Sequence, residues 1–319
     1  MLEWIHVSGV GVVGSFLLWE LDQLGVEFSW DDVESPLNAW EVSTGGILPY
    51  PDGDPSPYAA AYRFWRDDVA LRPVLAPYLE PVRVLHALKS RSARSRAEQW
   101  ALLAEAPRGV RLWQEPTTGW QLNVQEFVVF TRRHFQARRV QPTEVTDVPG
   151  YRVTQVWCRG VGDPRARPVP VWGWQLAVEL TPTASSPLWA GAHRFALHFS
   201  DPVSSLTRLY LQPVATVGHL WWAGTDKRLQ RQPQREDARA EAQVARFKQV
   251  VTDLFGGWLE ATYHTHIGQG WRPQARSAPW RGVACVEVNA KLLIAAPLGR
   301  NGVQRGPLVA RDIAALLCA

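Results

Sequence analysis

The sequence predicts an α/β protein in which a parallel-sheet domain is interrupted by an inserted α+β layer built on an antiparallel sheet. Three observations predict this fold. The chain opens with a strand, a glycine-rich turn, a helix and a second strand. Alternating apolar segments within residues 169–223 are typical of antiparallel strands. A β-prone run at 292–296, followed by a helix at 307–317, completes the first domain.

Composition places the chain among folded proteins. Of its 319 residues, 46% are hydrophobic and 20% are charged, which excludes a largely disordered chain. No run of about 18 apolar residues occurs, so we expect no membrane association and a cytoplasmic location. Cys158, Cys285 and Cys318 are far apart, so neither a disulfide framework nor a zinc site is expected, and we expect no metal.

The opening segment justifies the parallel sheet. Residues 4–8 are apolar and β-prone, residues 15–24 have helical spacing, Gly25 can end that helix, and residues 26–30 form the next strand. Further along, helices are expected at 58–65, 73–88, 93–105, 125–138 and 226–255. Strands are expected up to Trp157 and at 172–180, 194–199 and 208–214.

Three glycines carry the first functional prediction. Gly9, Gly11 and Gly14 form G-x-G-x-x-G between the first strand and the first helix. Such glycines permit the turn, let the backbone approach a pyrophosphate and let the helix pack on the strand. Asp32 lies 32 − 14 = 18 residues after Gly14, at the end of the second strand, where an acid can accept ribose hydroxyl hydrogen bonds; Asp31 is the neighbouring candidate. A Rossmann-like dinucleotide site is predicted, with NAD and FAD both open.

Four further segments, in chain order, carry the second functional prediction. The first is the small-residue loop Ser43, Thr44, Gly45, Gly46 with residues 47–49. The second is 210–213, followed by Gly224 and Thr225, and the third is Gly270, Trp271, Arg272 and Pro273. The last is Gly299, Arg300, Asn301 and Gly302, followed by Pro307. Together these segments resemble the D-amino acid oxidase and glycine oxidase family of flavoenzymes.

The resemblance implies a glutathione-reductase-like FAD-binding domain made of residues 1–50, about 115–165 and 265–319, with non-covalent FAD. Residues 51–114 and about 166–264 would form the inserted substrate domain. It further implies hydride transfer from the amine-bearing carbon of a small amine or amino acid to flavin N5, followed by imine hydrolysis. Arg272 and Arg300 would bind a substrate carboxylate, and Tyr210 would flank the substrate.

Departures from the family pattern leave two alternatives open. Residues 274–279 replace the usual acid and glycine after Arg-Pro, and Cys158 and Arg159 stand where small apolar residues are commoner. Some bacterial viruses carry related flavin-dependent lyases that cleave an amino acid attached to thymine in DNA. The 17 tryptophans, the arginine bias and the cluster Arg91, Arg94, Arg96 would suit a nucleic-acid substrate. A non-catalytic flavoprotein subunit is the second alternative, and the oligomeric state is left open.

His264 and His266 would share one strand face, as metal ligands can, but no third ligand is near in the sequence. We therefore interpret them as a structural pair.

Overall fold

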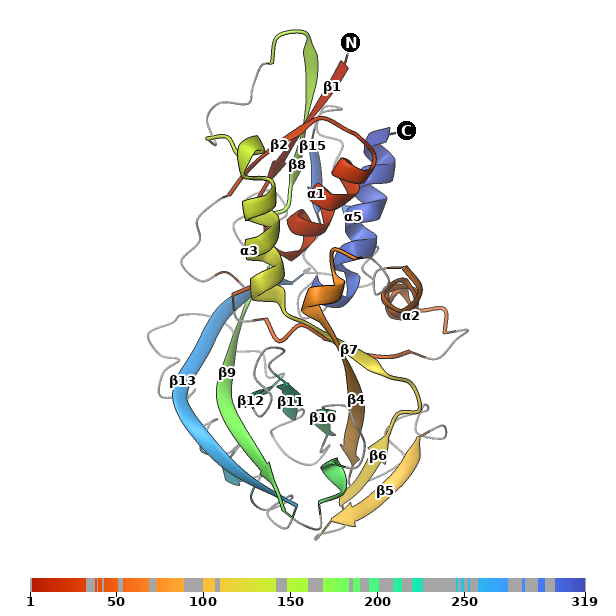
Figure 1. The fold of residues 1–319 in the computed structure, drawn as a ribbon, viewed down its shortest axis with the longest axis vertical. Coiled ribbons are helices and arrows are strands. Elements are labelled where there is room, and N and C mark those ends of the chain that lie inside the picture. The colour runs from red at the N-terminus through yellow and green to blue at the C-terminus, as the bar shows by residue number, and fades with distance from the viewer. Residues whose placement is uncertain are drawn as a thin grey trace.

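The structure is a computed structural model of the whole chain. It describes residues 2–32, 38, 40–41, 43–50, 54–68, 73–88, 100–106, 110–141, 148–159, 169–183, 186–189, 195–200, 209–213, 220–225, 245, 248–249, 252, 258–274, 283–284, 292–295 and 302–318. Figure 1 shows two sheets, one above the other along the long axis of the molecule. Both chain termini lie at the end that contains the first strand.

Five described strands form the first layer, called the parallel sheet below. They are β1 (Leu2–Ser8), β2 (Phe28–Asp31), β8 (Tyr151–Trp157), β14 (Val283–Ala284) and β15 (Leu292–Ala295), in the order β14-β15-β8-β1-β2. All neighbours are parallel except the β14–β15 pair. Helix α1 (Val12–Gln23) connects β1 to β2, so the predicted βαβ opening is confirmed.

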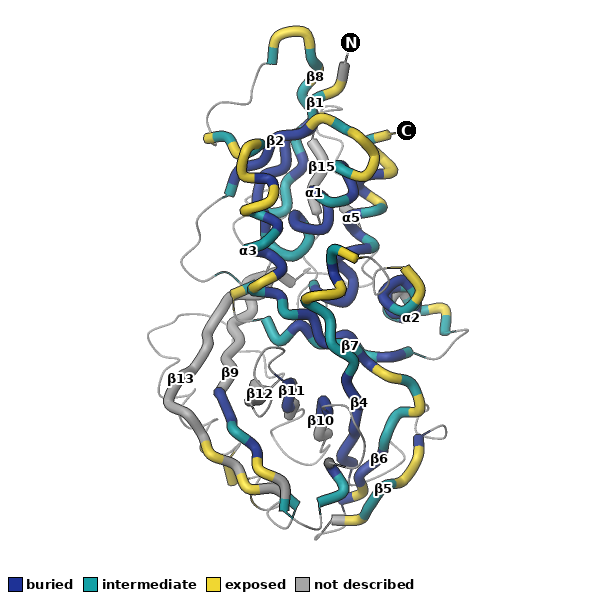
Figure 2. Tube along the Cα trace, in the orientation of Figure 1, coloured by how far each residue is buried: buried dark blue, intermediate teal, exposed yellow. Residues whose placement is uncertain are grey.

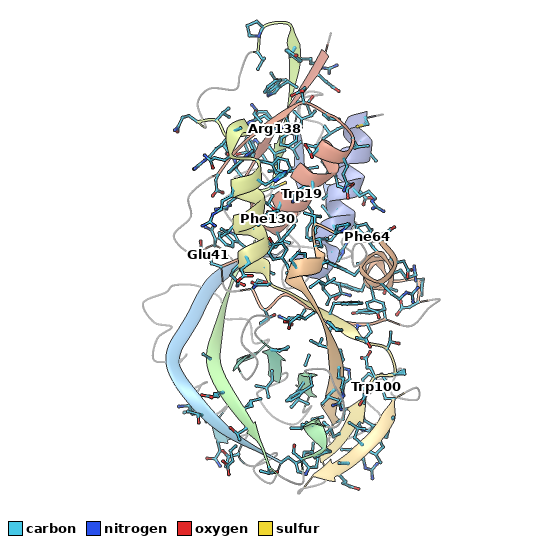
Figure 3. All side chains as sticks on the ribbon, viewed as in Figure 1. Trp19, Glu41, Phe64, Trp100, Phe130 and Arg138 are labelled. Carbon is cyan, nitrogen blue, oxygen red and sulfur yellow. The ribbon has the colours of Figure 1, made fainter. Side chains whose placement is uncertain are left out.

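Three helices cover one face of the parallel sheet: α1, α3 (Val124–His134) and α5 (Gly302–Cys318) (Figure 1). Figure 2 shows dark buried stretches where these helices meet the strands. The rings of Trp19 on α1 and Phe130 on α3 stack at 5.9 Å between centroids (Figure 3). Helix α5 was expected to begin at Pro307, but it begins at Gly302. Gly306 lies against α1, where an added Cβ would be 3.2 Å from Val12 Cγ1. The part of α5 before Pro307 therefore packs closely on α1, and this contact supports the earlier start of the helix.

Ten described strands form the second layer, called the large sheet below. Their main order is β13-β9-β12-β11-β10-β4-β6-β5, with β3 and β7 attached beside β4. The strands are β3 (Gly46–Ile47), β4 (Leu79–Leu88), β5 (Ala101–Ala106), β6 (Val110–Gln114), β7 (Gly119–Leu122), β9 (Val169–Pro182), β10 (Phe195–Ser200), β11 (Leu209–Pro213), β12 (Leu220–Thr225) and β13 (Leu259–Gln274). All described strand pairs of this sheet are antiparallel except β4–β10, which confirms the predicted antiparallel layer.

Short helical elements join the two sheets. Helix α2 (Pro57–Arg63) begins after Ser56, whose side chain accepts from the Ala59 N–H, and continues as the π-helical turn η1 (Phe64–Asp68). Trp65 Nε1 donates to the Gln304 carbonyl at 2.8 Å and ties this segment to α5. The remaining turns are η3 (Ala76–Tyr78), η7 (Gln136–Arg138) and η9 (Pro187–Trp189).

Two helix predictions are wrong. Residues 79–88 form the central strand β4, not a helix. Glu80, Arg83 and His86 recur every three residues, as on a helix, and because residues 82–88 are all buried the strand lacks the alternation of a half-exposed strand. Residues 101–105 belong to the edge strand β5, where pairing with β6 overrides the helix propensity of alanine and leucine. Residues 93–99 and most of 226–255 lie outside the described residues.

The described part of the chain holds no cluster of three metal-ligating side chains. None of its helices combines the length and apolar character needed to cross a membrane. Cys158 and Cys318 form no disulfide with each other, and Cys285 lies outside the described residues.

Candidate nucleotide-binding site

The glycine turn brings three backbone segments into contact at the carboxyl edge of the parallel sheet. Gly9 has φ +92°, a conformation that other residues rarely adopt, and an added Cβ would lie 2.9 Å from the Cys158 carbonyl carbon. An added Cβ at Gly14 would lie 2.3 Å from the Gly9 oxygen. Both glycines are therefore required by the packing of α1 and β8 on the turn.

Gly11 differs from the other two glycines. Among the described residues, an added Cβ there would meet Trp40 Cδ1 alone, at an ordinary contact distance of 3.5 Å. Gly11 is also the N-cap of α1, and no side chain caps that helix end. The first N–H groups of α1 are thus oriented for an anion, which the positive end of the helix dipole also favours. These features fit the pyrophosphate of a dinucleotide.

The two adjacent acids at the end of β2 have different partners. Asp32 Oδ2 lies 2.8 Å from Arg132 Nη2, and its carboxylate also accepts a hydrogen bond from the Val10 backbone. Burial raises the pKa of Asp32, although the positive charge of Arg132 opposes the shift. Asp31 instead lies within the opposite face of the sheet and is 1% exposed. The carboxylate of Asp32 therefore lies beside the glycine turn, whereas Asp31 contacts the turn through its backbone carbonyl, which accepts from the Gly9 N–H at 3.0 Å.

Arg132, which the sequence did not single out, clamps the glycine turn from helix α3. Its Nε and Nη2 donate to the Val10 carbonyl at 2.9 and 2.7 Å, and its guanidinium lies 4.7 Å from the centroid of the Trp40 ring. The same side chain therefore fixes the turn and the Asp32 carboxylate. No local sequence signal predicts this contact, because Arg132 and Val10 are 122 positions apart.

Asp31 is the centre of a buried polar chain. Ser8 Oγ donates to Asp31 Oδ1 at 2.5 Å, and His6 Nε2 lies 3.1 Å from Oδ2. Burial disfavours the charged carboxylate, but hydrogen bonds with His6 and Ser8, together with the charge of Arg159, hold the pKa of Asp31 below its usual value. Arg159 Nε donates to Ser8 Oγ at 2.7 Å and extends this chain to the carboxyl end of β8.

The small-residue loop lies next to the large sheet. Gly45 has φ +69°, and an added Cβ would overlap the Leu122 carbonyl oxygen, so its small size serves the contact with β7. Ser43 Oγ accepts from the Gly45 N–H at 3.4 Å, Thr44 is half-buried, and Gly46 pairs with Gln121. Gln125 Nε2 donates to the carbonyls of residues 40, 41 and 43 and holds the loop against α3.

The residues predicted to bind substrate are partly described. Arg272 pairs with Val171 in β13–β9, and Tyr210 pairs with Gly224 in β11–β12. Tyr210 and Arg272 lie on the same face of the large sheet. Residues two apart on a strand share a face, so Gly224, the partner of Tyr210, shares its face with Trp222 and with Ala177, the partner of Trp222. Val171, six residues before Ala177 on β9, lies on that face as well, and Arg272 is its partner. Gly302 is the first residue of α5, whereas Gly299, Arg300 and Asn301 lie outside the described residues, as do Arg91, Arg94 and Arg96.

The same face of the large sheet carries two histidines. His198 pairs with Tyr210 on one side and with His86 on the other. His86 Nε2 lies 2.6 Å from Glu115 Oε1, and its ring stacks on Trp100 at 3.9 Å. No local sequence pattern predicts that these histidines and Tyr210 lie side by side, because they come from separate strands. His264 and His266 fall in the irregularity of β13 between Tyr263 and Ile267.

Comparison with solved structures identifies the fold. Glycine oxidase from Bacillus cereus matches with a TM-score of 0.67 and 14% identity, over 99% of this chain and 94% of that chain. Iminodiacetate oxidase from Chelativorans sp. BNC1 matches with a TM-score of 0.65 and 15% identity, over 98% and 95%. The chain has the fold of these oxidases. The predicted fold class, a Rossmann-like domain with an inserted antiparallel layer, is thereby confirmed.

L-α-glycerophosphate oxidase from Mycoplasma pneumoniae, solved with FAD bound, matches with a TM-score of 0.65 and 11% identity over 100% of this chain and 96% of that chain. No protein-family model and no curated protein matches the sequence. The likeness is therefore one of fold across almost the whole length, at low sequence identity.

Proposed function

We propose that this chain binds FAD non-covalently along the carboxyl edge of the parallel sheet and oxidises a small amine or amino acid. One observation carries the proposal: the N-terminus of α1, which has no side-chain cap among the described residues, its N-cap Gly11 and the Asp32 carboxylate lie together at one edge. This arrangement suits a pyrophosphate with an adjacent ribose. The whole chain also has the fold of a glycine oxidase and of an oxidase solved with FAD.

Each residue at the edge has a distinct role in this proposal. The N–H groups at the start of α1 would bind the pyrophosphate, and Asp32 would accept from the ribose hydroxyls. Arg132 would keep Asp32 ionised against the effect of its burial and would hold the Val10 carbonyl in place. The loop 43–46, fixed by Gln125, would border the cofactor on the side of the large sheet.

The large sheet would provide the substrate side of the site. When bound, FAD supplies a two-electron acceptor for oxidation of the amine-bearing carbon. Arg272 would bind the substrate carboxylate through its guanidinium fork, and Arg300, which lies outside the described residues, would do the same. Tyr210, on the same face as Arg272, would border the substrate. Fixing the substrate at two points orients the carbon to be oxidised.

Anaerobic mixing tests this function. The purified yellow protein is mixed without oxygen with glycine, N-methylglycine, iminodiacetate or proline, and the blue absorption band is followed. Bleaching with at least one amine is expected. Arg272→Gln and Arg300→Gln should each slow bleaching by about 10- to 100-fold, because each loses a charge-assisted hydrogen bond worth about 1.5–3 kcal/mol.

The matched control is Arg152→Gln on the exposed amino end of β8, which should bleach like the wild type. Retention of the flavin spectrum in every variant separates a substrate defect from loss of cofactor. A flavin that none of these amines bleaches would contradict the proposed oxidation and favour the non-catalytic subunit.

A further inference from the structure

Arg159 ends the buried polar chain at the carboxyl edge of the parallel sheet. We propose that Arg159 binds a phosphate group of the dinucleotide, and that Ser8 and Asp31 hold it in position to do so. The inference rests on the proposed binding of FAD. It adds a side-chain phosphate ligand, from the segment that follows strand β8, to the backbone donors of the glycine turn.

The backbone at Arg159 touches the glycine turn. An added Cβ at Gly9 would lie 3.0 Å from Arg159 Cα, and the Cys158 N–H donates to the Ser8 carbonyl at 2.7 Å. Residue 159 therefore follows β8 at the same edge where β1 ends and α1 begins. Ligands of open α/β sheets bind outside these carboxyl ends of the strands.

The side chain is held by an uncommon set of polar contacts. Its Nε donates to Ser8 Oγ, which in turn donates to the carboxylate of Asp31, and its guanidinium lies 4.3 Å from the Trp157 ring centroid. The interior of a parallel sheet is normally apolar, and burying a carboxylate there is unfavourable unless hydrogen bonds compensate it. Hydrogen bonds with His6 and Ser8 compensate the burial of the Asp31 carboxylate, and Ser8 in turn holds Arg159 in position at the edge.

Toward the described residues, the terminal nitrogens of Arg159 are available to a ligand. Within the part of the chain that the structure describes, Nη1 and Nη2 make no hydrogen bond, while Nε is engaged with Ser8. Two parallel N–H donors match two phosphate oxygens. Asp32 and Arg132 lie on the β2 side of the glycine turn, so Arg159 supplies positive charge on the β8 side, where no other described side chain has been assigned to the ligand.

Titration of the deflavinated full-length protein with FAD, ADP and adenosine tests this role. Arg159→Gln should weaken binding of FAD and ADP by about 10- to 100-fold and leave adenosine binding unchanged, because only the first two carry phosphates. Ser8→Ala, which keeps the charge and loses the support, should weaken ADP binding by about 2- to 10-fold. Arg159→Lys should fall between wild type and Arg159→Gln.

The matched control is Arg152→Gln, near the amino end of β8 and about 20 Å from residue 159, and it should bind all three ligands like the wild type. Circular dichroism verifies that each variant is folded. Wild-type affinity for ADP in folded Arg159→Gln, with FAD bound by the wild type, would overturn the inference alone. A wild type that binds neither FAD nor ADP would overturn the proposed function as well.

Discussion

The two faces of the parallel sheet are built from alternate residues of the same strands, yet they have opposite chemistry. The face under the helices is apolar and fully buried; it contains Ile5, Val7, Phe28, Trp30 and Val156. The opposite face carries His6, Ser8, Ser29 and Asp31, which are as deeply buried but hydrogen-bonded to one another. Because strand side chains alternate, one segment serves both needs.

Stability and ligand binding therefore depend on different faces of the parallel sheet. Burial of apolar side chains under α1, α3 and α5 is the dominant stabilising contribution on the first face. The second face retains a carboxylate whose partners lead to Arg159 at the edge. Substitutions on the first face should therefore act on folding, and those along the polar chain should also act on the nucleotide.

The largest effect is expected on the apolar face. Leu17 is fully buried within the core, so Leu17→Ala should lower the free energy of unfolding by about 2–5 kcal/mol, measured by urea denaturation. The affinity of the folded protein for FAD should not change. Leu24→Ala, at a residue that is 53% exposed, is the control and should stay within about 0.5 kcal/mol of the wild type. Equal effects of the two substitutions would contradict the assigned core.

The next largest effect is expected at Arg132, which connects helix α3 to the carboxyl edge of the parallel sheet. Arg132→Gln removes the charge beside Asp32 and the hydrogen bonds to Val10, and should reduce FAD affinity by about 10- to 100-fold in a fluorescence titration. Arg133→Gln alters the next residue of α3, which is exposed, and should have no effect. If the Arg132→Gln and Arg133→Gln variants bound FAD equally well, the contacts of Arg132 with Asp32 and Val10 would have no role in FAD binding.

Asp31→Asn tests the polar face. It should lower the free energy of unfolding at neutral pH by about 1–3 kcal/mol, because it removes a charged acceptor from a buried network. The pKa of Asp31 is lower in the folded protein than its ordinary 3.8. Its stabilisation is thus fully present above that pH and is lost as the pH falls through the folded-state value. The gap between the two proteins should stay constant from about pH 8 to pH 5 and shrink in stronger acid; a gap that widens there would refute the assignment.

The smallest effect concerns the start of the polar face. Trp4 Nε1 donates to Ser29 Oγ at 3.0 Å, and Trp4→Phe should cost about 0.5–1.5 kcal/mol in urea denaturation without altering FAD affinity. A change in FAD affinity as large as that of Arg159→Gln would mean that the whole face, rather than its edge, acts on the ligand.

Local patterns could predict the parallel sheet and the turn, because spacing alone carries that information. Alternation along β2 could also predict which face Asp31 occupies. Phe28 and Trp30 face the helices, so Ser29 and Asp31 lie on the opposite face. The strand β4 could not be predicted, because a strand buried on both faces has no alternation. Arg132 and Arg159 depend on partners 122 and 151 positions away, which only the folded chain brings together.

The proposed binding of FAD is tested most directly by the absorption spectrum of the purified protein, followed by release and identification of any cofactor. Near-ultraviolet and blue flavin bands are predicted, with FAD released intact by heat because no covalent bond holds it. A colourless protein that takes up NAD and no FAD would contradict the proposed site.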